Sequence, residues 1–238
     1  MRSRFSRREF LLLATAVGGF GAAVVVLERL RSLLSMPSPT PLSLTPQPAP
    51  QIVSRSEWGA LPPNHDAVNE YGHAETPLES AWYVYNRPLD EIYNTVVIHH
   101  SATLLGANET MPSLQRLHLE INQWADVAYH YAIDKNGVIY EGRDIHVRGA
   151  SVAGHNTGII GVVVMGDFER DQPLDLQITV LQSLVNWLAG IYSLSHLAAH
   201  AEFNPESICP GEHFVPYLDQ LAQNAGLARG TEGYVAPL

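Results

Sequence analysis

Three separated residues of this chain have the side chains of a metal site. His99 lies in VVIHHSAT, His200 in LAAHAEFN and Cys209 in SICPGEHF. Two imidazoles and one thiolate can hold a zinc ion and leave its fourth position open to water, which is the arrangement of a catalytic zinc rather than a structural one. If the three side chains converge in space, the sequence predicts a zinc hydrolase.

Cys209 has a second interpretation. It is the only cysteine among 238 residues, so it has no intrachain disulfide partner. A lone cysteine is commonly a small buried apolar residue. The Pro210-Gly211 pair that follows it and the two histidines favour the metal ligand.

The expected secondary structure brings these residues together. Residues 95–100 are β-branched and apolar and predict a buried strand that ends at the two histidines. A short strand at 197–200 delivers His200, and Cys209 lies in the loop that follows it. Neighbouring strands lie less than about 5 Å apart, so the imidazoles can meet at one edge of a sheet.

The rest of the pattern completes one α/β domain. We expect a single domain in which a central mixed β-sheet is flanked by about three helices. The expected elements are a helix capped by Thr110 with Leu117 and Ile121 at helical spacing, a hairpin turning at Asn136-Gly137, a central strand at 159–165, a helix capped by Asp175, a helix at about 213–224 and a loose tail.

The N-terminal part of the chain predicts export and a tether. Residues 1–35 carry a twin-arginine pattern, Ser6-Arg7-Arg8-Glu9-Phe10-Leu11, before an uncharged apolar run at 10–27. No clear cleavage site follows, so a cleaved signal and a retained membrane anchor both stay open. Residues 36–50 contain six prolines and no charge, which predicts an extended linker. Residues 51–238 form the domain, which we expect to be monomeric and to lie in the cell envelope or outside the cell.

Charge excludes one class of partner. The whole chain has a net charge of −10 and residues 1–35 carry six arginines and two glutamates, a net of +4, so the remainder carries −14. Binding to nucleic acid depends on neutralising phosphates with Lys and Arg. An acidic domain is therefore a poor candidate for nucleic-acid binding.

Five sequence blocks, in order, resemble one family. They are IVSRSEWGA, VVIHHSAT, DVAYHYAIDKNGVIYEGR, GHNTGIIGVVVMGDF and HAEFNPESICPG, between about residues 52 and 221. The chain resembles the zinc-dependent N-acetylmuramoyl-L-alanine amidases of the peptidoglycan recognition protein and T7-type lysozyme superfamily. The resemblance implies Zn²⁺ on His99, His200 and Cys209, and peptidoglycan as the partner. It also implies cleavage of the amide between N-acetylmuramic acid and L-alanine of the stem peptide.

The resemblance also implies catalytic roles. Tyr129 matches the family's catalytic tyrosine and is expected to stabilise the oxyanion that forms when water, activated at zinc, attacks the amide carbonyl. Ser207 stands where some members carry Lys or Thr, and it brings a hydrogen bond without a positive charge. Val163 occupies the place of the catalytic glutamate of a related branch. The proton donor to the leaving amine stays open.

Four further residues are candidates for substrate contact, each with a structural alternative. His100 should face away from His99 and has a pocket role or a structural one. His155 and Asn156 lie on a loop that could line a groove or simply form a turn. Arg143 could meet a stem-peptide carboxylate, although a surface ion pair is slightly favoured.

Two other functions compete with the amidase. A non-catalytic peptidoglycan receptor on the same fold commonly lacks the cysteine ligand, which this chain retains. An unrelated metal hydrolase such as a deacetylase could share the ligand types, but it would release acetate rather than a free alanine amino group.

Overall fold

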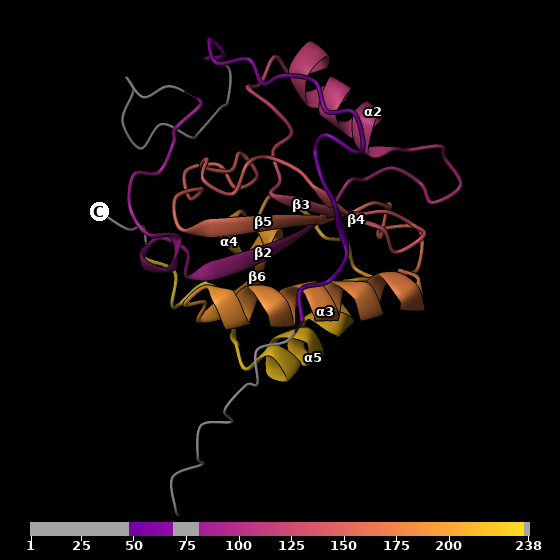
Figure 1. Cartoon of the computed structure of the whole chain (residues 1–238). Helices are drawn as coiled ribbons and strands as arrows, with labels where there is room; N and C mark the ends of the chain where they lie inside the picture. The colour runs from indigo at the N-terminus through magenta and orange to yellow at the C-terminus, as the bar shows by residue number, and fades with distance from the viewer. Residues whose placement is uncertain (1–47, 69–80, 236–238) are drawn as a thin grey trace, which may run out of the picture. The chain divides into compact units, whose positions relative to one another are not determined.

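A computed structural model describes residues 48–68 and 81–235, which fall within one compact unit. In it a single sheet separates helices on its two faces (Figure 1). No helix of the described residues is long and apolar enough to cross a bilayer. The twin-arginine pattern, the apolar run at 10–27 and most of the predicted linker lie outside the described residues.

The sheet has seven strands in the order β1-β4-β3-β5-β2-β6-β7. Only β3 and β4 pair antiparallel, and the other neighbours are parallel. The predicted mixed sheet is therefore confirmed. The strands are β1 (Ile52–Val53), β2 (Thr95–His100), β3 (Tyr131–Ile133), β4 (Ile139–Glu141), β5 (Ile159–Val164), β6 (His196–Ala199) and β7 (Ala228–Arg229).

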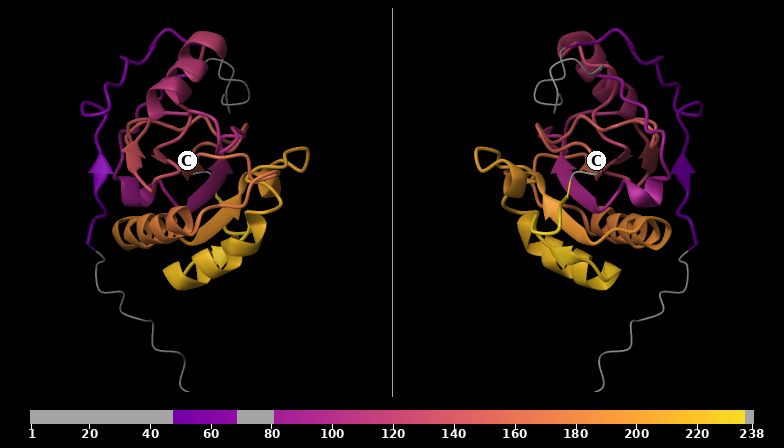
Figure 2. Two further views of the ribbon diagram at one scale, coloured as in Figure 1. Left: turned by 90° about the vertical axis from the view of Figure 1, so that its right-hand side faces the viewer. Right: turned by 90° about the vertical axis from the view of Figure 1, so that its left-hand side faces the viewer.

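Two amphipathic helices cover one face of the sheet, α3 (Asp175–Ile191) and α5 (Val215–Ala225). They lie side by side below the strands in Figure 1 and stay together when the view is turned in Figure 2. Leucines of both helices pack on alternate residues of β2 and β5 in the largest core cluster. Burial of apolar surface on this scale stabilises the sheet at roughly 25 cal/mol per Å².

The opposite face carries His99. In register, His99 of β2 lies beside Val163 of β5, which lies beside Ala132 of β3. Val163 and Ala132 belong to a second core cluster with Met111 and Leu114 of α2 (Met111–Arg116). His99 therefore lies on the face of the sheet that α2 covers, and α3 and α5 cover the other face.

The helix after Thr110 begins as predicted and ends differently. Thr110 Oγ1 accepts a hydrogen bond from the N–H of Ser113, as an N-cap should. Leu117–Ile121 then forms a π-helix. Its wider turn shifts the side-chain phase, so Leu117 is 44% and Ile121 74% exposed, while His118 turns inward.

Three local expectations are corrected. Asp175 is the first residue of α3 rather than its cap, and Gln177 Oε1 accepts from the N–H of Leu174 instead. His200 begins a short helix, α4 (His200–Phe203), directly after β6. The tail is fastened through Val235, because β7 pairs with β6 and the Tyr234 hydroxyl donates to the carbonyl of Thr157 at 2.8 Å.

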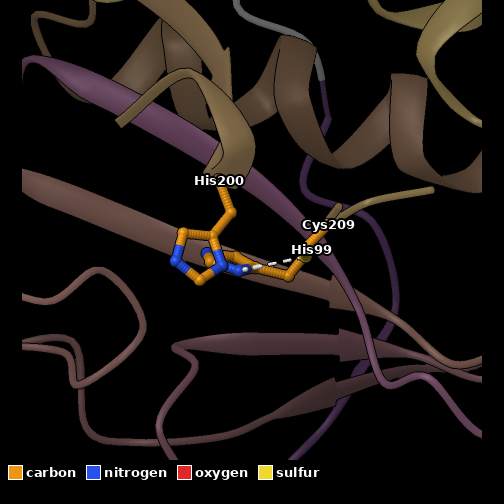
Figure 3. A group of neighbouring side chains, drawn as sticks. All are labelled: His99, His200 and Cys209. Atoms are coloured by element: carbon orange, nitrogen blue, oxygen red, sulfur yellow. Dashed lines mark hydrogen bonds between the residues drawn. The ribbon is translucent and has the colours of Figure 1, made fainter. Parts of the chain in front are cut away.

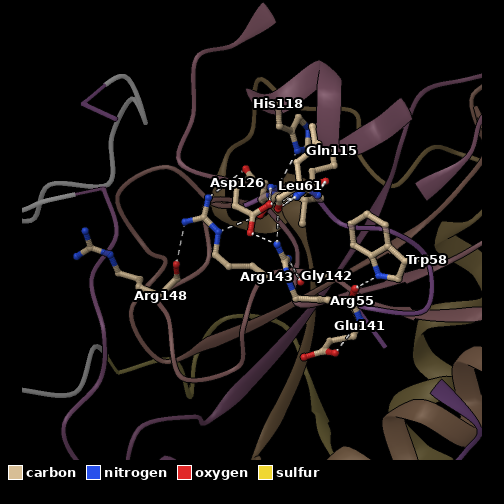
Figure 4. Close-up of polar contacts among 12 residues, drawn as sticks. Arg55, Trp58, Leu61, Gln115, His118, Asp126, Glu141, Gly142, Arg143 and Arg148 are labelled. Atoms are coloured by element: carbon tan, nitrogen blue, oxygen red, sulfur yellow. Dashed lines mark hydrogen bonds and ion pairs between the residues drawn. The ribbon is translucent and has the colours of Figure 1, made fainter. Parts of the chain in front are cut away.

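A buried polar network holds the segment after β1 against the core (Figure 4). Asp126, which is fully buried, forms an ion pair with Arg55 at 2.8 Å and accepts from Gln115 Nε2 at 2.7 Å. The Arg55 guanidinium also donates to the carbonyls of Gly142 and Leu61. The network thus joins three segments far apart in sequence.

We expect Asp126→Ala to destabilise the fold by about 3 kcal/mol, because it leaves the largely buried Arg55 cation without its partner. Urea unfolding followed by circular dichroism measures the change. The matched control is Asp219→Ala, which removes an 88%-exposed carboxylate from its ion pair with Arg229 and should cost less than about 1 kcal/mol. Equal losses in the two variants would contradict the structural role of Asp126.

Candidate metal centre

His99, His200 and Cys209 come together in space (Figure 3), and His99 lies on the face of the sheet that α2 covers. Because Ile98 of β2 pairs with Ala199 of β6, the next residue of each chain segment places the two imidazoles side by side. Their ring centroids are 4.9 Å apart. One potential ligand atom from each of the three residues lies within 4.8 Å of the others.

The spacing of these atoms fits a metal ion. His99 Nδ1 and Cys209 Sγ are 3.6 Å apart, a contact drawn as a hydrogen bond in Figure 3. A tetrahedral zinc with about 2.0 Å to nitrogen and about 2.3 Å to sulfur places the two donors roughly 3.5 Å apart. His99 Nε2 is buried without a hydrogen-bond partner among the described residues. One ion cannot bind both nitrogens of a ring, so with Nδ1 facing the sulfur this second nitrogen calls for a water or another polar group.

The loop that carries Cys209 is fixed at several points. The N–H of His100 donates to Cys209 Sγ at 3.3 Å, and the carbonyl of Cys209 accepts from the N–H of Ala201 at 2.9 Å. Gly211 follows with φ +102, and a Cβ there would lie 2.4 Å from the backbone of Phe168. Only glycine fits this approach. The glycine of the Cys-Pro-Gly sequence is thus explained by packing.

Electrostatics keep both imidazoles neutral. Burial, reinforced by His200 and His100, holds the pKa of His99 well below its ordinary value, and burial also lowers the pKa of His200. Neutral imidazole is the form that binds metal. Burial raises the pKa of the Cys209 thiol to about 12, opposed by the N–H of His100. A divalent cation is the kind of charge that deprotonates such a thiol.

Tyr129 lies against the metal centre. Its ring centroid is 5.0 Å from that of His99 and 5.8 Å from that of His118. The His118 ring is itself held by the N–H of Ala128, which donates to Nδ1 at 3.1 Å. Burial, followed by the Cys209 and Glu109 charges, raises the pKa of Tyr129, so its hydroxyl stays protonated and can donate a hydrogen bond.

Ser207 has a structural contact of its own. Its hydroxyl accepts from the N–H of Cys209 at 3.2 Å, which helps to shape the turn that presents the sulfur. The oxyanion contact expected from the resemblance stays a prediction.

His100 points away from His99, as strand alternation predicts. Its Nδ1 accepts from the N–H of Phe168 at 3.3 Å on the side covered by α5. This contact fits the structural role, and a contact between the His100 side chain and substrate stays a prediction. The residue serves the metal centre through its main-chain N–H, which holds the Cys209 sulfur.

Arg143 and Asn156 both have main-chain partners. Arg143 is fully buried, and its guanidinium donates to the carbonyls of Val127, Arg148 and Asp126, as Figure 4 shows in part. Its burial excludes a surface position, and its contact with a stem-peptide carboxylate stays a prediction. Asn156 is buried, and its Oδ1 accepts from the N–H groups of residues 151 and 152 at 2.8 Å each, which is the turn role. Sequence alone does not show that these two side chains form hydrogen bonds with main-chain groups.

His155, the fourth candidate, is half-buried in an aromatic cluster. Its ring centroid is 5.2 Å from that of Phe203 in α4 and 5.7 Å from that of Tyr234. Phe203, which the His155 ring contacts, lies about one helical turn after His200 in α4. Its contact with substrate stays a prediction.

One carboxyl group near the site was not expected from the sequence. Glu109 accepts hydrogen bonds from Ser101 and Thr103, and its charge is felt by Tyr129. The available signal was Ser101 and Thr103 directly after the strand that carries His99, since loops at strand ends commonly build sites.

Comparison with known proteins gives a consistent result. The model of the family described as N-acetylmuramoyl-L-alanine amidase matches residues 89–212. A peptidoglycan-recognition protein SD of Drosophila simulans is 32% identical over 166 residues, 65% of this chain and 79% of that protein. An N-acetylmuramoyl-L-alanine amidase of Sus scrofa is 32% identical over 133 residues, 52% of this chain and 19% of that protein.

Among solved structures, the N-acetylmuramoyl-L-alanine amidase LysC of Clostridium intestinale URNW aligns with a TM-score of 0.53 at 26% identity, covering 61% of this chain and 95% of that one. The family match includes all three residues of the metal centre and Tyr129. The chain therefore belongs to the N-acetylmuramoyl-L-alanine amidase family.

Proposed function

We propose that this chain is a zinc hydrolase that cleaves the amide between N-acetylmuramic acid and L-alanine of peptidoglycan. The observation that carries the proposal is the convergence of His99, His200 and Cys209 beside the half-buried ring of Tyr129. The family match and the amidase-named relatives support the same reaction.

The roles follow from the geometry. His99, His200 and Cys209 would hold zinc, which when bound lowers the pKa of a coordinated water toward neutrality and polarises a carbonyl oxygen. Tyr129 keeps its proton and directs its hydroxyl at the oxygen of the scissile carbonyl as negative charge develops there. Ser207 sets the turn that presents Cys209. A preorganised donor such as Tyr129 contributes about 3 kcal/mol to catalysis.

One digestion tests the reaction. Purified protein with measured zinc content is incubated with defined peptidoglycan, and the new ends are identified by mass spectrometry. The proposal requires intact N-acetylmuramic acid lactyl groups and free amino groups on L-alanine. Release of acetate would identify a deacetylase instead. A zinc-loaded protein that binds the fragments without cleaving them would be the non-catalytic receptor.

We also propose that residues 1–35 direct export by the twin-arginine route and place the domain in the cell envelope or outside the cell. The paired arginines ahead of an apolar run support this. Replacing Arg7 and Arg8 with lysine should stop export while keeping the charge, and cell fractionation with immunoblotting measures it. Changing Arg2 and Arg4 to lysine is the matched control. Normal export of the Arg7/Arg8 variant would contradict the assignment.

A further inference from the structure

His200 is held by less of the sheet than His99. His99 lies within β2, which has β5 on one side and β6 on the other. His200 is the first residue of α4, a single turn that follows β6. Among residues 48–68 and 81–235, none forms a hydrogen bond with the His200 ring. The position of this imidazole therefore depends on the contacts that hold α4.

The helix α4 is also tied to a second candidate ligand. The N–H of Ala201, its second residue, donates to the carbonyl of Cys209 at 2.9 Å. A shift of this one turn would therefore displace both His200 and Cys209 relative to His99. Contacts outside the ligands themselves orient metal ligands, and the loss of one commonly lowers metal affinity by about 10- to 100-fold.

An ion pair with the C-terminal part of the chain holds the start of α4. Glu202 Oε2 accepts from the N–H of Ala199, the residue before His200, at 2.6 Å. The same oxygen pairs with Arg229 of β7 at 2.7 Å. Arg229 also donates to the carbonyl of Leu197 at 2.9 Å, so its guanidinium joins α4 to the strand that leads into it. The two charged side chains are only 22% and 35% exposed, so water screens this pair less than an ordinary surface pair.

An aromatic contact holds the other end of α4. The ring of Phe203, the last residue of the helix, lies edge-on to the ring of Tyr234, with their centroids 5.2 Å apart. Edge-to-face is a preferred geometry for aromatic pairs. Tyr234 is itself fixed, because its hydroxyl donates to the carbonyl of Thr157 and the next carbonyl, that of Val235, accepts from Asn94 Nδ2.

We propose that the C-terminal segment 228–235 braces the metal centre, and that Arg229 and Tyr234 are positioning residues. Both lie beyond the part of the chain that the family model matches. One holds the start of α4 and the other holds its end, so together they set the orientation of His200 and the place of the Cys209 carbonyl. The inference rests on the proposed zinc hydrolase only through its metal site.

Zinc affinity tests the brace without any cleavage step. The full chain is freed of metal, and its zinc dissociation constant is measured by competition with a chromophoric chelator. Arg229→Met removes the ion pair with Glu202 and should weaken zinc binding about 10-fold. Asp219→Ala is the matched control, because it removes the exposed second partner of the same guanidinium and should leave zinc affinity unchanged.

Two more variants separate the contacts from general packing. Tyr234→Ala should also weaken zinc binding about 10-fold, because Phe203 loses its aromatic contact, whereas Val235→Ala changes an exposed neighbour and should have no effect. Arg229→Lys keeps the positive charge beside Glu202 and should bind zinc more tightly than Arg229→Met. Equal weakening by the lysine and methionine variants would reject the ion pair as the cause.

Cobalt(II) in place of zinc gives a second measurement, since its visible absorption depends on the number and geometry of its ligands. The spectrum should change in Arg229→Met and Tyr234→Ala and stay the same in Asp219→Ala and Val235→Ala. Circular dichroism of the metal-free chains shows which variants fold. If Arg229→Met does not fold, Arg229→Lys and Tyr234→Ala decide the question.

Normal zinc affinity and an unchanged cobalt spectrum in the folded brace variants would overturn the proposal. If the same variants cleaved peptidoglycan normally, the amidase would still stand. Loss of zinc affinity in these variants of a chain that cleaves no peptidoglycan would instead reject the amidase and support the brace.

Discussion

Cys209→Ala is expected to abolish both zinc binding and amidase activity. Alanine removes the one anionic donor of the metal centre and leaves two neutral imidazoles, whose burial already disfavours any positive charge. Two ligands do not make a catalytic zinc site. A metal ion contributes several kcal/mol to stabilisation of the transition state, so its loss should lower the rate by at least about 10³-fold. Zinc is measured by elemental analysis after gel filtration, and activity by release of free alanine amino groups.

The control for this change keeps the loop and the metal. Glu206→Ala lies three residues earlier on the same loop and removes an exposed side chain. It should retain stoichiometric zinc. If Cys209→Ala still bound one zinc per chain and cleaved at the normal rate, the sulfur would not be a ligand and the proposed centre would be wrong.

Tyr129→Phe is expected to keep zinc and lose about 10² to 10³-fold in kcat, with a small change in KM. The hydroxyl acts on charge that develops only in the transition state, so its removal lowers kcat more than substrate binding. Because the ring that packs between His99 and His118 is retained, the fold and the metal site should be unaffected. Steady-state kinetics on a soluble muramyl peptide measures both constants.

Tyr217→Phe is the matched control, since Tyr217 lies in α5 on the far side of the sheet. It removes the same hydroxyl from a site without a role in catalysis and should keep the rate. A normal kcat for Tyr129→Phe would reject the oxyanion role. A loss of zinc in that variant would instead assign the hydroxyl to the support of a ligand.

The sequence predicts the ligands because they depend on local patterns. Thr95–His100 was expected as a buried strand, and the structure gives the same limits. Once two parallel strands end in histidines, the short distance between neighbouring strands brings the rings together. The cap at Thr110 was predictable for a similar reason, since it involves residues three apart.

The errors involve groups whose partners are distant in the chain. Arg143 was weighed as a surface residue because arginine is rarely buried, and only the folded chain brings three carbonyls to its guanidinium. A regular α-helix with 3.6 residues per turn would bury Leu117. The π-helix after Arg116 breaks this period, so Leu117 is exposed instead. The position of Glu109 could not be predicted, because the residues that line a pocket with it, such as Lys135 and Met165, come from other segments of the chain.

Two adjacent residues of β2, His99 and His100, have their side chains on opposite faces of the sheet. His99 faces the metal centre, while His100 packs on Phe168 in the apolar interior and its N–H points at the sulfur. One peptide bond therefore serves two purposes: the side chain of His99 is a candidate ligand, and the N–H of His100 holds the sulfur of another candidate ligand.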